Sequence, residues 1–359
     1  MTHDGDAGRC SVRPGDPVAI TGAAGFIGSA ITRRLLDRGA VVTALIEPGG
    51  DTRNLDGLEV ERRTVDVRDR HAVVDALDGQ RFVFHTAALY SFWSRDPSVF
   101  SQVNVEGTRN VLEAADQSGC ERVIYTSTVG TVGLHHTGSG APADENCYAD
   151  IAHLFGHYKR TKYVAEHEVL RAAAQGAPVV LVLPTFPLGP RDTRPTPTGQ
   201  LVLDFLNGKI PGFVDTSLNV AHVDDLAEAH ILAAERGRTG RSYIAGGENM
   251  AMAELLATLA AVTGLPAPTR RFPRALALLA GAVSESFQGR LLRRQPFVSM
   301  EAARMSTTSM IFDDSRARSE IGYSSRPAIE AITDSARWFV DHGYVRPARR
   351  SRISWPTPT

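Results

Sequence analysis

The sequence predicts an α/β fold, a doubly wound parallel sheet with a smaller C-terminal lobe. Short apolar runs alternate with stretches of helical periodicity through the first half of the chain. These runs are not divided by polar residues, which is typical of strands covered by helices on both faces of a sheet. The chain has 359 residues, 43% hydrophobic and 22% charged, so it can form a large domain with an added lobe.

The apolar runs and the helical periodicity define the expected elements. Strands are expected at 18–21, 41–46, 60–65, 82–85, 123–126 and 179–183, and helices at 26–38, 99–115 and 151–174. We assign residues 17–184 to a nucleotide-binding domain and residues 185–345 to a substrate-binding lobe intertwined with it. The polar N-terminus, residues 1–16, and the basic, proline-rich tail, residues 346–359, are expected to be disordered.

Charge and cysteine content exclude several classes of protein. The net charge of −1 gives no indication of a nucleic-acid partner. Cys10, Cys120 and Cys147 lie far apart without CxxC spacing, so a cytoplasmic protein without disulfides is expected. No stretch approaches the ~18 uninterrupted apolar residues of a membrane span.

A glycine-rich turn joins the first expected strand to the first expected helix. Its glycines follow a GxxGxxG spacing, which permits a tight turn and a close approach of the backbone to a pyrophosphate at the positive end of the helix. The turn therefore predicts a Rossmann-type domain that binds a dinucleotide. The expected contacts come from Gly22, Ala24, Gly25, Phe26, Ile27 and Gly28.

Further cofactor contacts are expected where later strands end. Glu47 follows the second strand, where a carboxylate can accept from both ribose hydroxyls and would repel a 2′-phosphate. This favours NAD over NADP, although the nearby Arg53 weakens the preference. The other expected contacts are Asp66 and Val67 at the adenine, and the small Ala87 and Ala88 at the cofactor backbone.

Tyr158 and Lys162 form the most informative pair in the chain. Only three of its 39 basic residues are lysines, so a lysine four residues after a tyrosine stands out. On a helix both side chains share one face. An ammonium lowers the pKa of a nearby phenol from about 10, which makes the phenol usable in proton transfer. Thr128, at the end of the preceding strand, is expected to point into the same crevice and share a substrate oxygen.

Together these motifs resemble the extended short-chain dehydrogenases/reductases, the NAD-dependent epimerase/dehydratase family. The resemblance covers about residues 17–340. It is strongest toward the hopanoid-associated sugar epimerases and the dihydroflavonol-reductase-like enzymes. The motifs that carry it are TGAAGFIG at 21–28, DVRD at 66–69, HTAA at 85–88, YTST at 125–128, YKRTK at 158–162 and HVDD at 222–225.

The resemblance implies a catalytic triad of Thr128, Tyr158 and Lys162, with Ser127 as the alternative hydroxyl. Lys162 is also expected to bind the cofactor by holding the nicotinamide ribose. The resemblance also implies that Pro184 and Thr185 pass near the nicotinamide, and that Asn104 has a structural or proton-relay role. The chain departs from the sugar-nucleotide dehydratases, which place Asp-Glu after the triad threonine. Val129 and Gly130 stand there instead, so water elimination is not expected.

Three functions remain open at this point. The first is a dehydrogenase or ketoreductase that acts on a small, partly apolar molecule, and the second is a sugar epimerase that keeps NAD tightly bound. The third, a non-catalytic NAD-binding protein, conflicts with the intact triad. A homodimer is expected. Substrate contacts are assigned to Thr128 and Tyr158, to the aromatic residues Tyr90, Phe92, Trp93, Phe186 and Phe213, and to Arg191, with Arg194 and Lys209 as further cations for a diphosphate.

Two further features could indicate a metal site and a membrane contact, but each has a simpler interpretation. His153 and His157 have the spacing of a metal pair, but no third ligand is evident, and no metal is expected. The Ala/Leu-rich stretch 275–283 lies between arginines and could touch a membrane surface. A core helix with solvated flanks explains it more simply.

Overall fold

A parallel sheet of seven strands forms the centre of the molecule. The computed structural model describes residues 10–91, 93–134, 141–286 and 300–355. The strand order is β10-β6-β5-β4-β1-β2-β3, and each pair of neighbours is parallel. The strands are β1 (Pro17–Thr21), β2 (Val41–Ile46), β3 (Glu61–Thr64), β4 (Phe82–His85), β5 (Arg122–Thr126), β6 (Val179–Pro184) and β10 (Ser242–Ala245). The strand order reverses between β1 and β4, which is where open sheets of this kind bind ligands.

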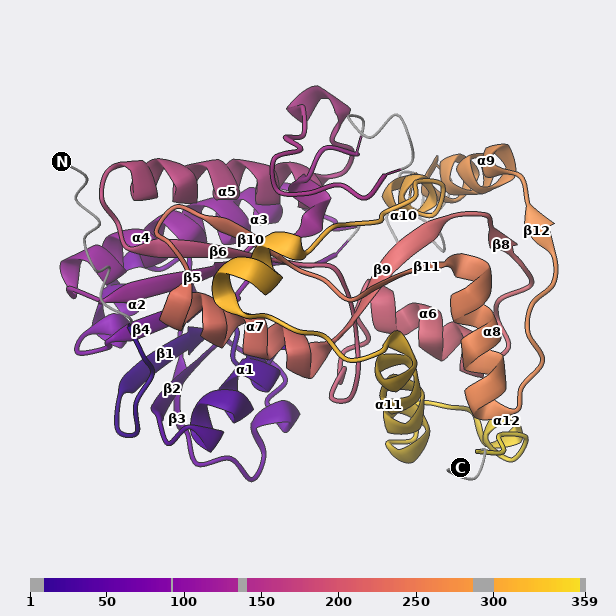
Figure 1. Cartoon of the computed structure of the whole chain (residues 1–359), viewed down its shortest axis with the longest axis horizontal. Coiled ribbons are helices and arrows are strands. Elements are labelled where there is room, and N and C mark those ends of the chain that lie inside the picture. The colour runs from indigo at the N-terminus through magenta and orange to yellow at the C-terminus, as the bar shows by residue number, and fades with distance from the viewer. Residues whose placement is uncertain (1–9, 92, 135–140, 287–299, 356–359) are drawn as a thin grey trace.

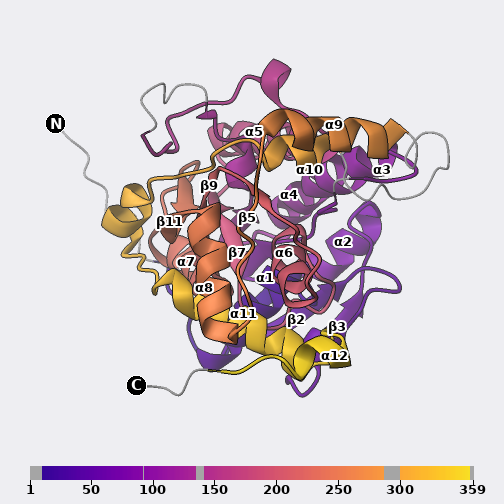
Figure 2. The ribbon, with the colours of Figure 1, turned by 90° about the vertical axis from the view of Figure 1, so that its right-hand side faces the viewer.

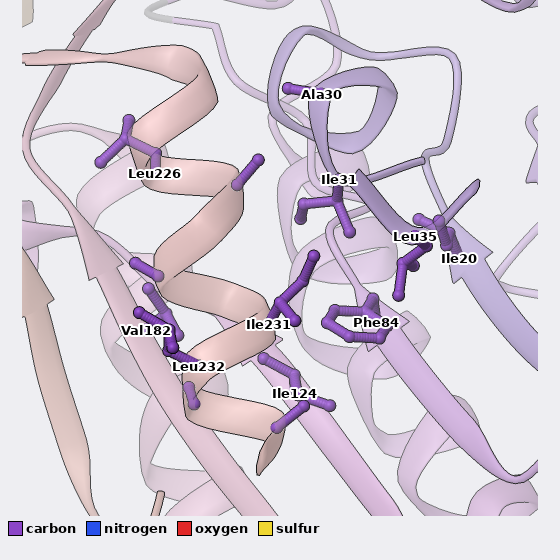
Figure 3. Packing of buried hydrophobic residues seen from close by; sticks show 14 of the residues in the cluster. Ile20, Ala30, Ile31, Leu35, Phe84, Ile124, Val182, Leu226, Ile231 and Leu232 are labelled. Atoms are coloured by element: carbon purple, nitrogen blue, oxygen red, sulfur yellow. The ribbon is translucent and has the colours of Figure 1, made fainter. Parts of the chain in front are cut away.

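Helices cover both faces of the sheet, as the undivided apolar strands predicted (Figure 1). On one face lie α1 (Phe26–Asp37) and α7 (Val223–Arg236), and on the other lie α2 (Arg70–Leu77), α4 (Gly107–Gln117) and α5 (His157–Ala174). Figure 3 shows the first of these layers, where Ile31 of α1 and Ile231 of α7 meet above Phe84 and Ile124 of the sheet. All four side chains are fully buried.

The second half of the chain contributes to this domain and also builds the lobe. Both α7 and β10 follow the expected boundary at residue 184, yet they complete the central sheet and its helix layer. The lobe has its own core, and Figure 2 views it with α8 and α11 in front. Its elements are β7 (Phe186–Leu188), α6 (Pro197–Leu206), β8 (Phe213–Val214), β9 (Ser217–His222), β11 (Glu248–Ala251), α8 (Met252–Thr263), β12 (Arg271–Phe272), α9 (Arg274–Ser284), α10 (Met300–Met305), α11 (Ala328–Asp341) and α12 (Pro347–Arg350).

Both chain ends are more ordered than their composition suggested. Cys10 and Val12 are buried in the core beside the sheet, within the N-terminal segment expected to be disordered. In the C-terminal tail, α12 is followed by Ile353 and Trp355, which pack against the lobe core. The Ser354 N–H donates to the Thr263 carbonyl at 3.0 Å. Disorder was therefore wrong for residues 10–16 and 346–355, because a few apolar side chains suffice to dock each segment.

Three expected helices differ from the structure. The helix expected at 99–115 is divided into α3 (Ser98–Ser101), a π-helical turn (Gln102–Glu106) and α4. The helix expected at 151–174 begins only at His157, because a separate 3-10 turn holds residues 151–153. The helix α9 is not buried in the core, since Leu276, Leu279 and Val283 are exposed along it. Among the described residues, no helix is long and apolar enough to span a bilayer.

Because α7 belongs to the central domain, we expect Ile231→Ala to destabilise the whole molecule. The truncation leaves a cavity between α7, α1 and the sheet, which costs about 2–5 kcal/mol in the free energy of unfolding. Chemical denaturation should show one transition shifted to lower denaturant. Val283→Ala is the control, because this side chain is 60% exposed and should cost less than about 0.5 kcal/mol. A separate, earlier transition for the sheet would contradict the shared core.

Candidate functional site

The glycine turn between β1 and α1 has the geometry that a pyrophosphate needs. Gly22 has a positive φ of 68°, and the Gly25 N–H donates to its carbonyl at 2.9 Å. A Cβ on Gly28 would lie 2.2 Å from that carbonyl oxygen, so the first turn of α1 can approach only if Gly28 has no side chain. Ala87 backs the turn, and its N–H donates to the Thr21 hydroxyl at 3.2 Å.

Two acidic residues expected at the adenosine end already have basic partners. Glu47 is exposed after β2 and pairs with Arg194 at 2.9 Å. Arg53 was expected to weaken the preference for NAD that Glu47 indicates, but its guanidinium pairs with Asp51. The Asp66 carboxylate lies beside the Arg68 guanidinium, whose hydrogen bonds hold the pKa of this carboxyl below its usual range. Each carboxylate thus lies at the expected edge of the sheet, but an approaching ribose or adenine would meet an ion pair there.

The end of β6 supplies a polar group without a protein partner. Thr185 is 7% exposed, and its hydroxyl has no hydrogen-bond partner among the described residues. It directly follows Pro184, the last residue of β6, at the same edge of the sheet as the glycine turn. A buried, unsatisfied hydroxyl is costly unless a ligand satisfies it. This unpartnered hydroxyl and the turn around Gly22 and Gly28 are compatible with a bound dinucleotide.

Lys162 is buried and held at the end of β5. Its Nζ donates to the Thr126 carbonyl at 2.6 Å and to the Tyr125 hydroxyl at 2.9 Å, and it lies 4.3 Å from the centre of the Tyr125 ring. Burial lowers the pKa of the ammonium to about 7, while the nearby Glu166 carboxylate acts to raise it. Only 3% of Lys162 is exposed, so its ammonium is held by hydrogen bonds to β5 and is not solvated by bulk water.

Tyr158 is hydrogen-bonded to the Thr128 side chain, so the structure brings these two predicted site residues together. The pKa of the Tyr158 phenol is raised above its usual range, mainly by burial, although the bond to Thr128 acts to lower it. The prediction that Lys162 lowers this pKa is wrong for this structure. The ammonium is directed to Tyr125 and the backbone of β5, so it does not offset the desolvation of Tyr158.

The alternative hydroxyl, Ser127, has a different partner. Ser127 donates a short hydrogen bond to Glu166 of α5, and Thr131 donates to the same carboxylate oxygen at 2.8 Å. Glu166 lies four residues after Lys162, so one helix face connects the loop after β5 to the lysine. Ser127 therefore fixes this loop, and Thr128 is the hydroxyl that faces Tyr158.

Asn104 lies in the π-helical turn and holds two segments of the site together. It is 1% exposed, accepts from the Leu89 N–H at 2.7 Å, and donates to the Thr161 hydroxyl at 3.0 Å. The π-helical turn places the Asn104 side chain between the loop after β4 and helix α5. Of the two roles that the resemblance implied, these contacts provide the structural one.

The residues assigned to the substrate do not all gather at the triad. The Tyr90 ring lies 4.8 Å from the Tyr158 ring, and Trp93 is partly buried in the loop that follows. Phe186 and Phe213 instead pack against the core of the lobe.

Arg191 forms a short ion pair with Asp224, at the start of α7, while its carbonyl accepts from Asn54 near the glycine turn. Its assignment to the substrate is not supported by these contacts. Phe92 lies outside the described residues.

Several residues at the site had no clear signal in the sequence. Tyr125 reads as an ordinary strand residue, and its contact with Lys162 depends on the approach of α5 to β5. Glu166 continues the helical spacing of Tyr158 and Lys162 and could have been found on that basis. Glu301 comes from α10 and accepts from the backbone N–H of Lys159. A contact between residues so far apart in the sequence cannot be recognised from local spacing.

We expect Gly28→Ala to abolish dinucleotide binding, because the new methyl group would collide with the Gly22 carbonyl. Gly130→Ala is a matched control, since its added methyl would make only ordinary contacts at 3.4–3.6 Å. Calorimetric titration with NAD should show at least about a hundredfold weaker binding for Gly28→Ala, the order expected when about 3 kcal/mol of interaction is lost. Unchanged binding by Gly28→Ala would refute the assigned pyrophosphate position.

Comparison with known proteins agrees with this geometry. Residues 18–246 match the model of the NAD dependent epimerase/dehydratase family. The chain is 40% identical over 331 residues to a protein of Synechocystis sp. named "Putative dihydroflavonol 4-reductase", covering 91% of this chain and 95% of the other. It is 33% identical to Sterol demethylase protein B of Methylococcus capsulatus, covering 91% and 99%.

A solved structure extends the comparison to the fold. The crystal structure of gox2253 superimposes with a TM-score of 0.82 at 40% identity, covering 92% of this chain and all of that chain. The expected cofactor NAD and the parallel sheet predicted from the sequence are confirmed. The chain belongs to the NAD-dependent epimerase/dehydratase family of enzymes.

Proposed function

We propose that the protein is an oxidoreductase that reduces a ketone, or oxidises the matching secondary alcohol, through Thr128, Tyr158 and Lys162. The observation that carries the proposal is the hydrogen bond between Tyr158 and Thr128, beside a lysine buried at the end of the same strand. Two hydroxyls that converge in this way can hold one substrate oxygen and pass a proton to it.

Each side chain has a distinct role in the reductive direction. Thr128 orients the carbonyl oxygen, and Tyr158 donates its proton to that oxygen as the C–O bond order falls. Burial holds Tyr158 as a phenol, which is the form that can donate. When bound, NADH supplies the hydride to the carbonyl carbon. Lys162 holds α5 against the end of β5 and thereby positions Tyr158.

The contacts of the arginines favour this function over nucleotide-sugar epimerisation. A nucleotide sugar carries a diphosphate that needs cations, for which Arg191, Arg194 and Lys209 were considered. Arg191 pairs with Asp224, Arg194 with Glu47 and Lys209 with Asp204. These carboxylates would have to be displaced, so a small substrate without a diphosphate fits the described contacts better. A non-catalytic role does not explain why Tyr158 and Thr128 meet.

We expect Tyr158→Phe to lower kcat for ketone reduction by about 10²–10⁴-fold, because it removes the proton donor. Binding of NADH should be unchanged. Tyr163→Phe is the control, since Tyr163 lies on the same helix but its ring packs against His167, 4.1 Å away. Steady-state assays of NADH oxidation measure the effect. Retained turnover in Tyr158→Phe would defeat the triad, and turnover without net consumption of NADH would indicate epimerisation.

A further inference from the structure

A cavity lies beside the triad, and the polar groups of its lining include Lys159 and Glu301, which the proposed reaction does not use. The loop after β5, the segment before α5 and helix α10 form its walls, and α10 lies next to α9 at one edge of the molecule (Figure 1). Most of the lining is apolar, including Val129, Val132, Leu154, Met305 and Met310. Lys159 and Glu301 also line it.

Glu301 leaves one buried carboxylate oxygen unsatisfied. The side chain is 6% exposed, and it accepts from the backbone N–H of Lys159 in the first turn of α5. A Cβ on Gly156 would lie 1.8 Å from Oε2, so this oxygen fills the space that the glycine provides. Oε1 has no hydrogen-bond partner among the described residues. Because an unsatisfied buried acceptor is costly, this oxygen indicates a ligand.

Lys159 places an ammonium close to both Glu301 and the reacting centre. The position that a Cβ on Gly130 would occupy is 3.6 Å from Lys159 Cε and 3.4 Å from Thr128 Oγ1. Lys159 is therefore close to the hydroxyl that is proposed to hold the substrate oxygen. Burial lowers the pKa of Lys159 and the Glu301 carboxylate acts to raise it, so the two side chains lie near each other.

We propose that this cavity is a substrate subsite for an apolar segment that ends in a hydroxyl group. This inference rests on the proposed function and specifies its substrate class. A hydroxyl can donate to Glu301 Oε1 and accept from the Lys159 ammonium at the same time. A terminal methyl would leave the buried Glu301 oxygen unpaired.

The test compares matched ligands in the presence of NAD. The probes are short 2-alkanones that end in a hydroxyl or in a methyl, and their dissociation constants are measured by saturation-transfer NMR. The wild-type protein should bind the hydroxyl ketone about tenfold more tightly than its methyl counterpart, as expected for one charge-assisted hydrogen bond.

Two variants connect this preference to the cavity. Lys159→Met keeps the length of the side chain, and Glu301→Gln keeps its shape; each should reduce the preference for hydroxyl over methyl to about twofold or less. Lys209→Met removes the exposed third lysine and should leave it unchanged. Melting temperatures distinguish a lost contact from a loss of folding.

Equal binding of the hydroxyl and methyl ketones by the wild type, or a preference that survives in both variants, would overturn the subsite. Binding is measured without turnover, so the outcome is independent of the proposed reaction. A failure of every ketone to oxidise NADH would refute the reaction, whereas a binding preference lost in the variants would still support the subsite.

Discussion

The attachment of Lys162 to the end of β5 is the interaction on which the rest of the site depends. Its ammonium bonds to the Thr126 carbonyl and the Tyr125 hydroxyl, both within the buried sheet. An isolated buried charge would be costly, so these contacts fix the distance between α5 and β5. Tyr158 lies one helical turn before Lys162, and Thr128 lies two residues after Thr126, which is why the two hydroxyls meet.

The parts around this attachment come from distant segments of the chain. Glu166 binds Ser127 and Thr131 and holds the loop after β5, while Asn104 holds the loop after β4 against α5. From the second half of the chain, α10 contributes Glu301 to the first turn of α5. The central sheet positions Thr128, Tyr158 and Lys162, and α10 lines the cavity beside them.

The sequence predicted the features that depend on local spacing. The turn at Gly22–Gly28, the undivided strands and the four-residue separation of Tyr158 and Lys162 each follow from positions close together in the chain. Features that depend on packing were missed or misjudged. The direction of the Tyr158 pKa follows from burial, the pairing of Glu47 with Arg194 joins distant loops, and the docking of Trp355 depends on a lobe surface that composition does not describe.

The central claim, that Lys162 is a buried charge held by the sheet, can be tested by NMR titration. Because the chain has three lysines, labelling lysine Cε with carbon-13 gives three signals, which Lys159→Met, Lys162→Met and Lys209→Met assign. Burial lowers the pKa of Lys162 to about 7, so its signal should report the ammonium below that pH and the neutral amine above it. A Lys162 signal that titrates only near pH ~10, as in an exposed lysine, would contradict the account.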